Sequence, residues 1–307
     1  MSRAARGVRR QLRHLLARVA ERERVWRNHN RIAARRAQPG PPALGPVWPL
    51  PRSPHGPTDA EVLARAGRHP FWFHPFEFDG GLRLPGRPEA IGRRGGASAA
   101  RALQRFRHFM PWLLAETGGD LRGRRVLDIA CNAGFWSIQC ALLGAAEVLG
   151  FDARPDLIEQ ANLVKAIAGV ERATFRLLDF WQMDRETLGG PFDVVLNLGL
   201  LYHLPDPLGA LERTRGMARE HILLDTALHV ARAPLLLLRW EEPEDIASAA
   251  RPGIVTHPTK RAVEMMLRHL GLTDFLEVPL RSTDLPPTYL RDKRASWLIR
   301  VPDARGS

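Results

Sequence analysis

Cysteine is almost absent from this chain of 307 residues. The two cysteines, Cys131 and Cys140, form no CxxC pair and have no histidine nearby at a metal-ligand spacing. This scarcity argues against a disulfide framework and a structural zinc site, so we expect no bound metal and a reducing, cytoplasmic environment. The sequence also lacks any apolar run of about 18 residues, which argues against a membrane span.

Lysine is scarce too, whereas arginine is abundant. Only three lysines occur, a bias typical of a GC-rich bacterial genome. The net charge of +12 is unevenly distributed, because residues 1–36 carry twelve arginines against Glu21 and Glu23. The rest of the chain is therefore nearly neutral, and the isoelectric point alone indicates no function.

Apolar residues recur at helical spacing within this basic start, from Val8 to Trp26. The pattern predicts a basic amphipathic helical arm over residues 1–36. Four interpretations remain open for it: packing of the apolar stripe on the body, binding of nucleic acid, contact with an anionic membrane, or a cleaved transit peptide. Packing is favoured, because most such stripes are packing surfaces.

A proline-rich segment follows the arm. Eight prolines between Pro39 and Pro57 predict an extended linker over residues 37–57. Thr58 and Glu61 then have the spacing of a capping box, so a short helix is expected to begin there.

An aromatic cluster at residues 71–78 precedes the turn signal Asp79-Gly80-Gly81. This combination predicts a hairpin or a lid, whose aromatic rings either pack or stack on a planar substrate. Residues 98–116 have a helical pattern. We assign residues 58–118 to an N-terminal helical and lid extension.

From residue 119 to residue 307 the pattern alternates between short apolar strands and helices. This alternation predicts an α/β fold with a doubly wound sheet, whose ligand site lies at the carboxyl ends of the strands. The last two strands are expected to form a terminal antiparallel hairpin, and Leu235–Leu238 with Trp240 a buried or substrate-side helix. The expected strands are 126–129, 148–151, 175–178, 194–196, 222–224, 275–280 and 296–301, and the expected helices are 134–143, 155–168 and 258–270.

The turn Asp128–Gly134 lies where the first of these strands meets a helix. A dinucleotide fingerprint would need glycine at three positions that hold Ala130, Asn132 and Phe135. A phosphate-binding P-loop also fails, because no G-K-[ST] sequence follows the turn.

Acidic residues end three successive strands. Asp128 lies beside the turn, Asp152 ends the second strand and Asp179 ends the third. At these positions Asp152 is expected to accept the hydroxyls of a ribose, and Asp179 the amino group of an adenine. Three acids would repel a pyrophosphate, but they suit a ligand with a sulfonium and an ammonium group.

These residues resemble the class I S-adenosylmethionine (SAM) dependent methyltransferases over about residues 120–225. The family pattern, a hydrophobic pair followed by D-x-G-x-G-x-G, corresponds to Val126 through Gly134, with Ala130 and Asn132 in place of two glycines. Asparagine tolerates left-handed backbone angles, whereas alanine leaves less room. The resemblance implies SAM as cofactor and a seven-stranded Rossmann-like sheet.

A narrower resemblance, to the tRNA wobble-uridine carboxymethyltransferases and their relatives, covers most of residues 60–302. It rests on the stretch Phe192–His203, which includes Asn197, and on Pro207-Leu208 and Lys293-Arg294-Ala295. By this resemblance Tyr202 and Arg294 lie next to the transferred group, and Asn197 is among the cofactor contacts.

One departure from these tRNA enzymes concerns a lysine that also contacts the carboxylate of carboxy-SAM. The comparable stretch here is Trp72-Phe73-His74-Pro75-Phe76, without lysine. Ordinary SAM is therefore the expected donor, because a cofactor carboxylate would lose a charge-assisted partner.

A general base is needed only if the acceptor atom carries a proton. His203 and His74 are the candidates for this base, and Tyr202 is expected to orient the acceptor by a hydrogen bond. His229 and His257 are expected to be ordinary surface or loop residues.

The sequence thus predicts a SAM-dependent methyltransferase acting on a small molecule, with specialised metabolism as the expected setting. Two alternatives remain open: modification of a tRNA uridine, which would make tRNA the partner, and a catalytically silent SAM-binding protein. The oligomeric state is left open.

Overall fold

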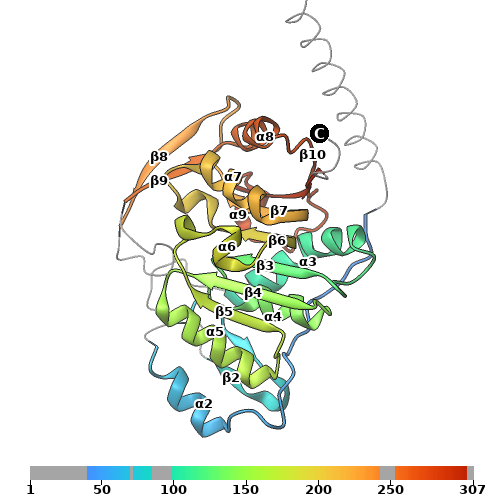
Figure 1. Ribbon diagram of the computed structural model, residues 1–307, viewed down its shortest axis with the longest axis vertical. Coiled ribbons are helices and arrows are strands. Elements are labelled where there is room, and N and C mark those ends of the chain that lie inside the picture. Colours follow the sequence, from blue (N-terminus) through green and yellow to red (C-terminus); the bar gives the residue numbers. More distant parts are fainter. Residues whose placement is uncertain (1–39, 70–71, 85–97, 243–252, 303–307) are drawn as a thin grey trace, which may run out of the picture.

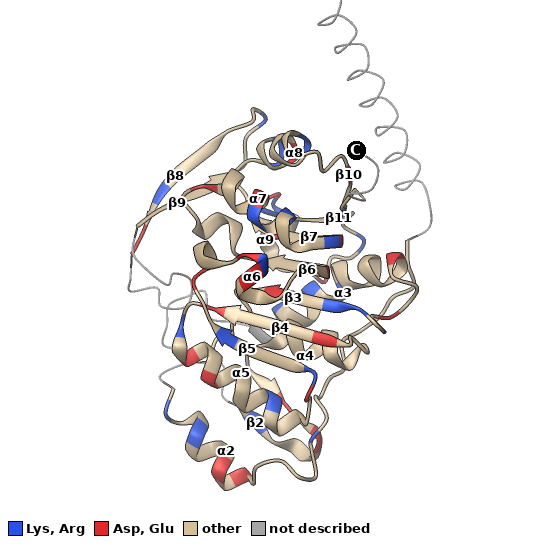
Figure 2. Ribbon diagram, in the orientation of Figure 1, with Lys and Arg blue, Asp and Glu red and all other residues tan. Residues whose placement is uncertain are grey.

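The computed structural model describes residues 40–69, 72–84, 98–242 and 253–302. The arm expected at residues 1–36 and Phe71 of the aromatic cluster lie outside the described residues. Within them, Lys and Arg are interspersed with Asp and Glu along the helices and strands (Figure 2). None of the described helices is long and apolar enough to cross a bilayer.

A seven-stranded sheet with the order β10-β11-β7-β6-β3-β4-β5 forms the centre of the described chain (Figure 1). The five strands from β3 to β7 are parallel, and β11 lies antiparallel between β7 and β10. The expected doubly wound sheet with an antiparallel terminal pair is confirmed. The strands are β3 (Arg125–Ile129), β4 (Glu147–Asp152), β5 (Ala173–Leu177), β6 (Phe192–Leu198), β7 (Ala218–Ala227), β10 (Asp274–Glu277) and β11 (Arg294–Arg300).

Helices cover both faces of the sheet. Because successive side chains of a strand point to opposite faces, Val194 and Leu196 belong to one hydrophobic core and Val195 to the other. The first core includes side chains of α3 (Ser98–Glu116), α4 (Phe135–Leu142) and α5 (Pro155–Ala168). The second includes side chains of α6 (Arg185–Leu188), α7 (Pro207–Met217) and α8 (Lys260–His269).

The N-terminal extension packs on the first of these cores. Its elements are α2 (Asp59–Ala66), β1 (Phe76–Glu77), the 3₁₀ turn η1 (Asp79–Gly81) and β2 (Arg83–Leu84). The capping box of Thr58 and Glu61 is present at the start of α2. Trp72, Phe76 and Phe78 are buried, so these aromatic rings are part of the core and do not face a substrate.

The described part of the proline-rich segment also lies on the body. Leu50 is fully buried, and its backbone N–H donates to the carbonyl of Glu77 at 2.8 Å. Further along, the N–H of Ser53 donates to the carbonyl of Ile167 in α5, also at 2.8 Å. Residues 40–57 therefore do not act as a free spacer between two separate units.

The expected helix at Leu235–Leu238 and Trp240 is wrong. These residues belong to β8 (Leu236–Glu241) and the residue before it, and β8 pairs only with β9 (Gly253–Pro258) as an antiparallel ribbon. The leucines are exposed instead of buried. The reason for the error is that a short apolar run has no periodicity that separates a helix from a strand.

Candidate functional site

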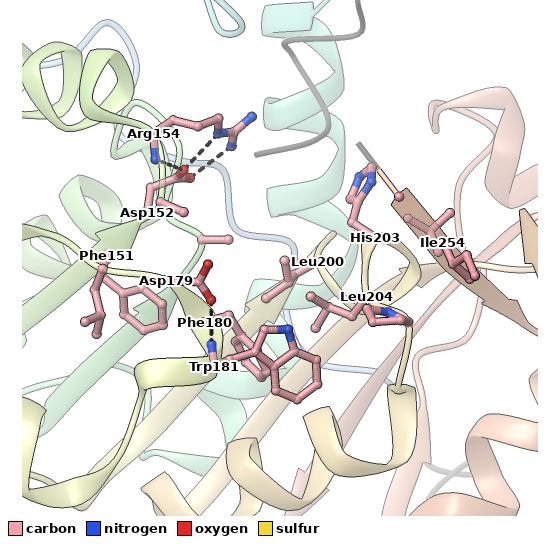
Figure 3. Close-up of a pocket in the computed structure, with 16 residues that line it drawn as sticks. Phe151, Asp152, Arg154, Asp179, Phe180, Trp181, Leu200, His203, Leu204 and Ile254 are labelled. Atoms are coloured by element: carbon pink, nitrogen blue, oxygen red, sulfur yellow. Dashed lines mark hydrogen bonds and ion pairs between the residues drawn. The ribbon is translucent and has the colours of Figure 1, made fainter. Parts of the chain in front are cut away.

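A cavity of about 420 Å³ lies at the carboxyl ends of β4 and β5 (Figure 3). Asp152 and Asp179 line one side of it, together with the apolar side chains of Phe151 and Phe180. The opposite side comes from η3 (Leu201–His203) with its flanking residues and from β9. Ligands of doubly wound sheets bind at this edge, where the strands end.

The turn between β3 and α4 adopts a left-handed backbone geometry, although two glycines of the family pattern are replaced there. Ala130, Asn132 and Gly134 all have positive φ, at 54°, 53° and 81°. A β-carbon at Gly134 would lie 2.8 Å from the ring of Phe175, so only glycine fits there. The backbone at Ala130 lines the cavity and brings the turn to the ligand.

Asp152 is buried and accepts four hydrogen bonds. The backbone N–H of Asn132 donates at 3.1 Å, which ties the turn to the end of β4. The backbone N–H of Arg154 donates at 3.1 Å, and its guanidinium donates through Nε at 2.9 Å and Nη2 at 3.0 Å. The carboxylate thus faces the cavity beside a cation from its own loop.

Asp179 caps the 3₁₀ helix η2 (Phe180–Gln182), and its Oδ1 accepts from the backbone N–H of Trp181 at 2.9 Å. This contact fixes the carboxylate on the cavity side, next to the rings of Phe180 and Trp181 (Figure 3). Asp179 is only half-buried, so acceptor positions remain accessible to a ligand.

Four expected cofactor residues are not among those that line the cavity: Asn132 and Gly134 of the turn, and Asp128 and Asn197. Asp128 is 1% exposed and accepts from the hydroxyl of Ser137 at 2.6 Å. Burial raises its pKa to about 7, with Asp152 adding to the effect against the hydrogen bond from Ser137. Asn197 is completely buried in β6, and its Nδ2 donates to the hydroxyl of Thr214 in α7. Both side chains therefore bond a strand to a neighbouring helix and do not line the cavity.

Tyr202 and Arg294 are in contact with each other, although neither is among the residues that line the cavity. Nη2 of Arg294 donates to the hydroxyl of Tyr202 at 3.2 Å. Nη1 of the same guanidinium donates to Asp225, which lies two residues before the end of the fifth parallel strand, β7. Arg105 of α3 donates to Asp225 at 2.6 Å, and Tyr289 and Ser296 also donate to it.

Asp225 and Arg105 were missed in the sequence. An acid at the end of the fifth expected strand is the same signal that marked Asp152 and Asp179, so the same argument could have predicted Asp225. Arg105 had no such signal, because one arginine in a helix looks like any other. Arg105 supplies this cluster with a second guanidinium beside that of Arg294, although the lysine of the tRNA enzymes is absent.

The charges of this cluster set the ionisation of two groups. Burial alone raises the pKa of Asp225, but the guanidiniums of Arg105 and Arg294 outweigh it and lower that pKa to about 2. Burial likewise opposes ionisation of Tyr202, yet His203 and Arg294 lower its pKa to about 8. Two cations against one carboxylate leave the cluster with an excess positive charge.

His203 lines the cavity, whereas His74 is not among the lining residues. Nδ1 of His203 lies 2.8 Å from a carboxylate oxygen of Glu241 in β8. His74 is buried against Phe135 at a ring distance of 6.0 Å, and burial lowers its pKa to about 3. The structure therefore favours His203 over His74 as a base.

The expectation for His257 needs correction. It is not a surface or loop residue, because it lies in β9 with its ring centroid 5.5 Å from that of Tyr202. Burial and the neighbouring Arg239 lower its pKa to about 4. His229 does lie in a loop. Tertiary pairing of β8 with β9, invisible in the sequence, brings His257 to the site.

The donor set fits the cofactor that the turn and the acids imply. Asp152 and Asp179 offer carboxylate oxygens to the hydroxyls and the amino group of an adenosine, and Phe151 and Phe180 supply apolar walls. Among the described residues, no group of three His, Cys, Asp or Glu side chains is placed to bind a metal ion.

Comparisons with known proteins agree with this geometry. A family described as "Methyltransferase domain" matches residues 120–248. The tRNA U34 carboxymethyltransferase of Campylobacter hominis is 26% identical over 58% of this chain and 61% of its own length. The same enzyme of Alcanivorax borkumensis is 29% identical over 60% of this chain and 55% of its own length. This chain thus spans less than two thirds of these relatives.

A ubiquinone biosynthesis O-methyltransferase of Bordetella parapertussis is 32% identical over 34% of this chain and 43% of its own length. Among solved structures, the N-terminal domain of EvdMO1 with S-adenosylhomocysteine (SAH) and D-fucose has a TM-score of 0.59 at 22% identity. The match covers 82% of this chain and 100% of that domain, and it shows that the two share a fold. The fold, the cavity at the strand ends and these matches support a class I SAM-dependent methyltransferase.

Proposed function

We propose that this chain transfers a methyl group from SAM to a small-molecule acceptor. The observation that carries the proposal is the placement of Asp152 and Asp179 at the ends of adjacent parallel strands, facing one cavity. Ala130, from the turn with left-handed Ala130 and Asn132, lines the same cavity.

The residues divide into two groups by their proposed roles. Asp152 would accept the ribose hydroxyls and Asp179 the adenine amino group, while Tyr202 and Arg294 would orient the acceptor. SAM, when bound, supplies an electrophilic methyl group on a sulfonium. Methyl transfer is an in-line displacement, so most of the rate enhancement can come from positioning. The hydrogen bond from Arg294 to Tyr202 fixes the hydroxyl for this purpose.

Calorimetry with SAH tests the cofactor site. We expect Asp152→Ala to weaken binding by about 1–3 kcal/mol, the range for losing charged hydrogen bonds. Asp156→Ala, which removes an exposed acid of α5, is the matched control and should bind SAH like the wild type. Equal affinity in the two variants would remove Asp152 from the site.

Methyl transfer from radiolabelled SAM tests the acceptor. Suitable probes are D-fucose, which accompanies SAH in the related EvdMO1 structure, and catechol, an aromatic diol that stands in for the ring acceptors of a ubiquinone O-methyltransferase. Transfer to either probe supports the small-molecule class. Transfer to tRNA with no transfer to small hydroxyl compounds would contradict it.

Modification of a tRNA uridine is the second candidate. The curated tRNA U34 carboxymethyltransferases favour it, and so does Arg105, which adds a guanidinium to the cluster around Asp225. Competition binding of SAM against carboxy-SAM separates the two candidates. We expect at least comparable affinity for SAM, and a hundredfold preference for carboxy-SAM would instead favour the tRNA reaction.

The basic arm offers an independent test of the tRNA candidate. If residues 1–36 bind tRNA, affinity must fall steeply with salt, by a slope of roughly 0.7–0.9 in log K for each neutralised phosphate. Deleting the arm would then flatten the slope by several units. We expect instead negligible tRNA binding with or without the arm, and a lower thermal stability after deletion.

A further inference from the structure

His203 and Glu241 form a dyad at the edge of the cavity. Nδ1 of the imidazole lies 2.9 Å and 2.8 Å from the two carboxylate oxygens of Glu241, so the ring nitrogen faces both. The side chains are 12% and 18% exposed, which protects the contact from water. Figure 3 shows His203 on the opposite side of the cavity from Asp152 and Asp179.

The β8–β9 ribbon positions Glu241 for this contact. Its strand β9 is tied to η3 because Thr256 donates from its N–H to the carbonyl of Leu204 at 3.1 Å and from its hydroxyl to the carbonyl of Pro205 at 2.9 Å. Register pairs Glu241 with Gly253, which also lines the cavity. The ribbon therefore brings a carboxylate to the histidine from a segment remote in sequence.

A carboxylate on Nδ1 selects one tautomer. The proton stays on Nδ1 to donate to Glu241, and Nε2 is left as the acceptor nitrogen. Such an arrangement, a histidine oriented by a carboxylate, is the usual construction of a general base.

The surrounding charges indicate the class of acceptor. Tyr202, whose ring centroid is 4.0 Å from that of His203, accepts a hydrogen bond from Arg294. The cluster around Asp225 has an excess cation because Arg105 joins Arg294 there. A positive environment disfavours an ammonium acceptor, and it stabilises an oxygen that gains negative charge as its proton leaves.

We propose that His203, positioned by Glu241, is the general base that deprotonates a hydroxyl acceptor, so that the chain is an O-methyltransferase of alcohols or phenols. This inference rests on the proposed methyltransferase function. The hydroxyl proton passes to Nε2 of His203 and then to water. The electron pair of the oxygen forms the new O–C bond, while the C–S bond of SAM breaks and leaves its pair on the sulfur of SAH.

The titratable and charged groups around His203 come from four elements. Tyr202 on η3 and Glu241 on β8 raise the pKa of His203 against the effect of burial, and the raised value is the net result. His257 on β9, with a pKa lowered to about 4, is neutral where His203 titrates, and Arg294 on β11 contacts Tyr202. Methyl transfer should therefore increase with pH as His203 loses its proton.

Imidazole ¹⁵N NMR of the SAH-bound protein tests the dyad without any acceptor. His203→Asn assigns the resonance. We expect protonation at Nδ1 in the neutral ring, and a fall of about one pH unit in the pKa of His203 in Glu241→Gln. Glu242→Gln, the same charge change at the exposed neighbouring residue, should leave the titration unchanged. A proton on Nε2, or equal titrations in both glutamine variants, would overturn the proposal.

The pH dependence of methyl transfer to D-fucose and catechol tests the base. Glu241→Gln should lower kcat at least tenfold and move the acidic limb of the profile to lower pH, with unchanged affinity for SAH. Glu242→Gln should behave as the wild type. A wild type that binds SAH but methylates amine or carbon probes, or no hydroxyl probe, would overturn the assignment. A wild type that fails to bind SAH would instead refute the proposed function.

Discussion

Arg154 forms a bidentate ion pair with Asp152, through Nε to Oδ1 at 2.9 Å and Nη2 to Oδ2 at 3.0 Å. Together with the backbone N–H groups of Asn132 and Arg154, this pair uses all of the roughly four acceptor positions of the carboxylate. A ribose that binds Asp152 must therefore displace the guanidinium, and Arg154 competes with the cofactor for the same oxygens.

The first prediction concerns this competition. Arg154→Ala should tighten SAH binding by about 1 kcal/mol, the net value of a typical hydrogen bond, because Asp152 no longer exchanges one partner for another. Isothermal calorimetry measures the effect. Arg154→Lys keeps the charge but loses the bidentate geometry, so its affinity for SAH should lie between those of the wild type and Arg154→Ala. Weaker binding in Arg154→Ala would show that the guanidinium contacts the cofactor directly.

The second prediction concerns the turn after β3. Ala130 has a φ of 54°, a left-handed conformation that costs an L-residue with a β-carbon about 1–2 kcal/mol. Ala130→Gly should raise the free energy of unfolding by up to about 1 kcal/mol, since the flexibility of glycine in the unfolded chain offsets part of the gain. Urea unfolding measures it. Ala161→Gly in the middle of α5 is the control and should destabilise.

The third prediction concerns the buried cluster around Asp225. Asp225→Asn removes the charge that Arg105 and Arg294 share and leaves two largely buried cations without a counter-ion. The free energy of unfolding should fall by about 3–5 kcal/mol, as for other broken buried ion pairs. Glu147→Gln breaks an ion pair with Arg125 at the surface and should cost about 1 kcal/mol or less. Similar losses in the two variants would mean that the cluster is well solvated.

The acids of the cofactor site were predictable from the sequence for a geometrical reason. Parallel strands end at one edge of the sheet, so Asp152 and Asp179 had to lie near each other once their strands were recognised. The placement of Asn197 was not predictable in this way. Every residue of strand β6 is buried, and nothing in its pattern told which face would meet α7.

The contact of Glu241 with His203 could not be predicted from the sequence, for a different reason. It contacts His203 only because β8 pairs with β9 and β9 is hydrogen-bonded to the residues after η3. The run Leu235–Leu238 gave no hint of this pairing, since its leucines do not alternate with polar residues and both faces of β8 are largely exposed. A dyad built by tertiary contact between remote segments leaves no local spacing to detect.

The last prediction concerns Asp128 and pH. This carboxyl is 1% exposed, and its pKa is raised by burial to about 7, whereas an unfolded aspartate titrates near pH 4. Between these values the folded protein binds a proton that the unfolded chain has lost. The free energy of unfolding contributed by Asp128 must therefore fall as pH rises from about 4 to about 7, by roughly 1.4 kcal/mol for each pH unit, and stay level above that.

Asp128→Asn removes this contribution, because the amide has no charge to desolvate and still accepts from Ser137. Urea unfolding of cofactor-free protein at pH 5, 6, 7 and 8 should show the variant gaining stability relative to the wild type up to about pH 7. Asp156→Asn, at an exposed site, should follow the wild-type curve at every pH. Parallel curves for Asp128→Asn and the wild type would show that Asp128 is ionised in the folded protein throughout this range, with Ser137 and solvent compensating for its burial.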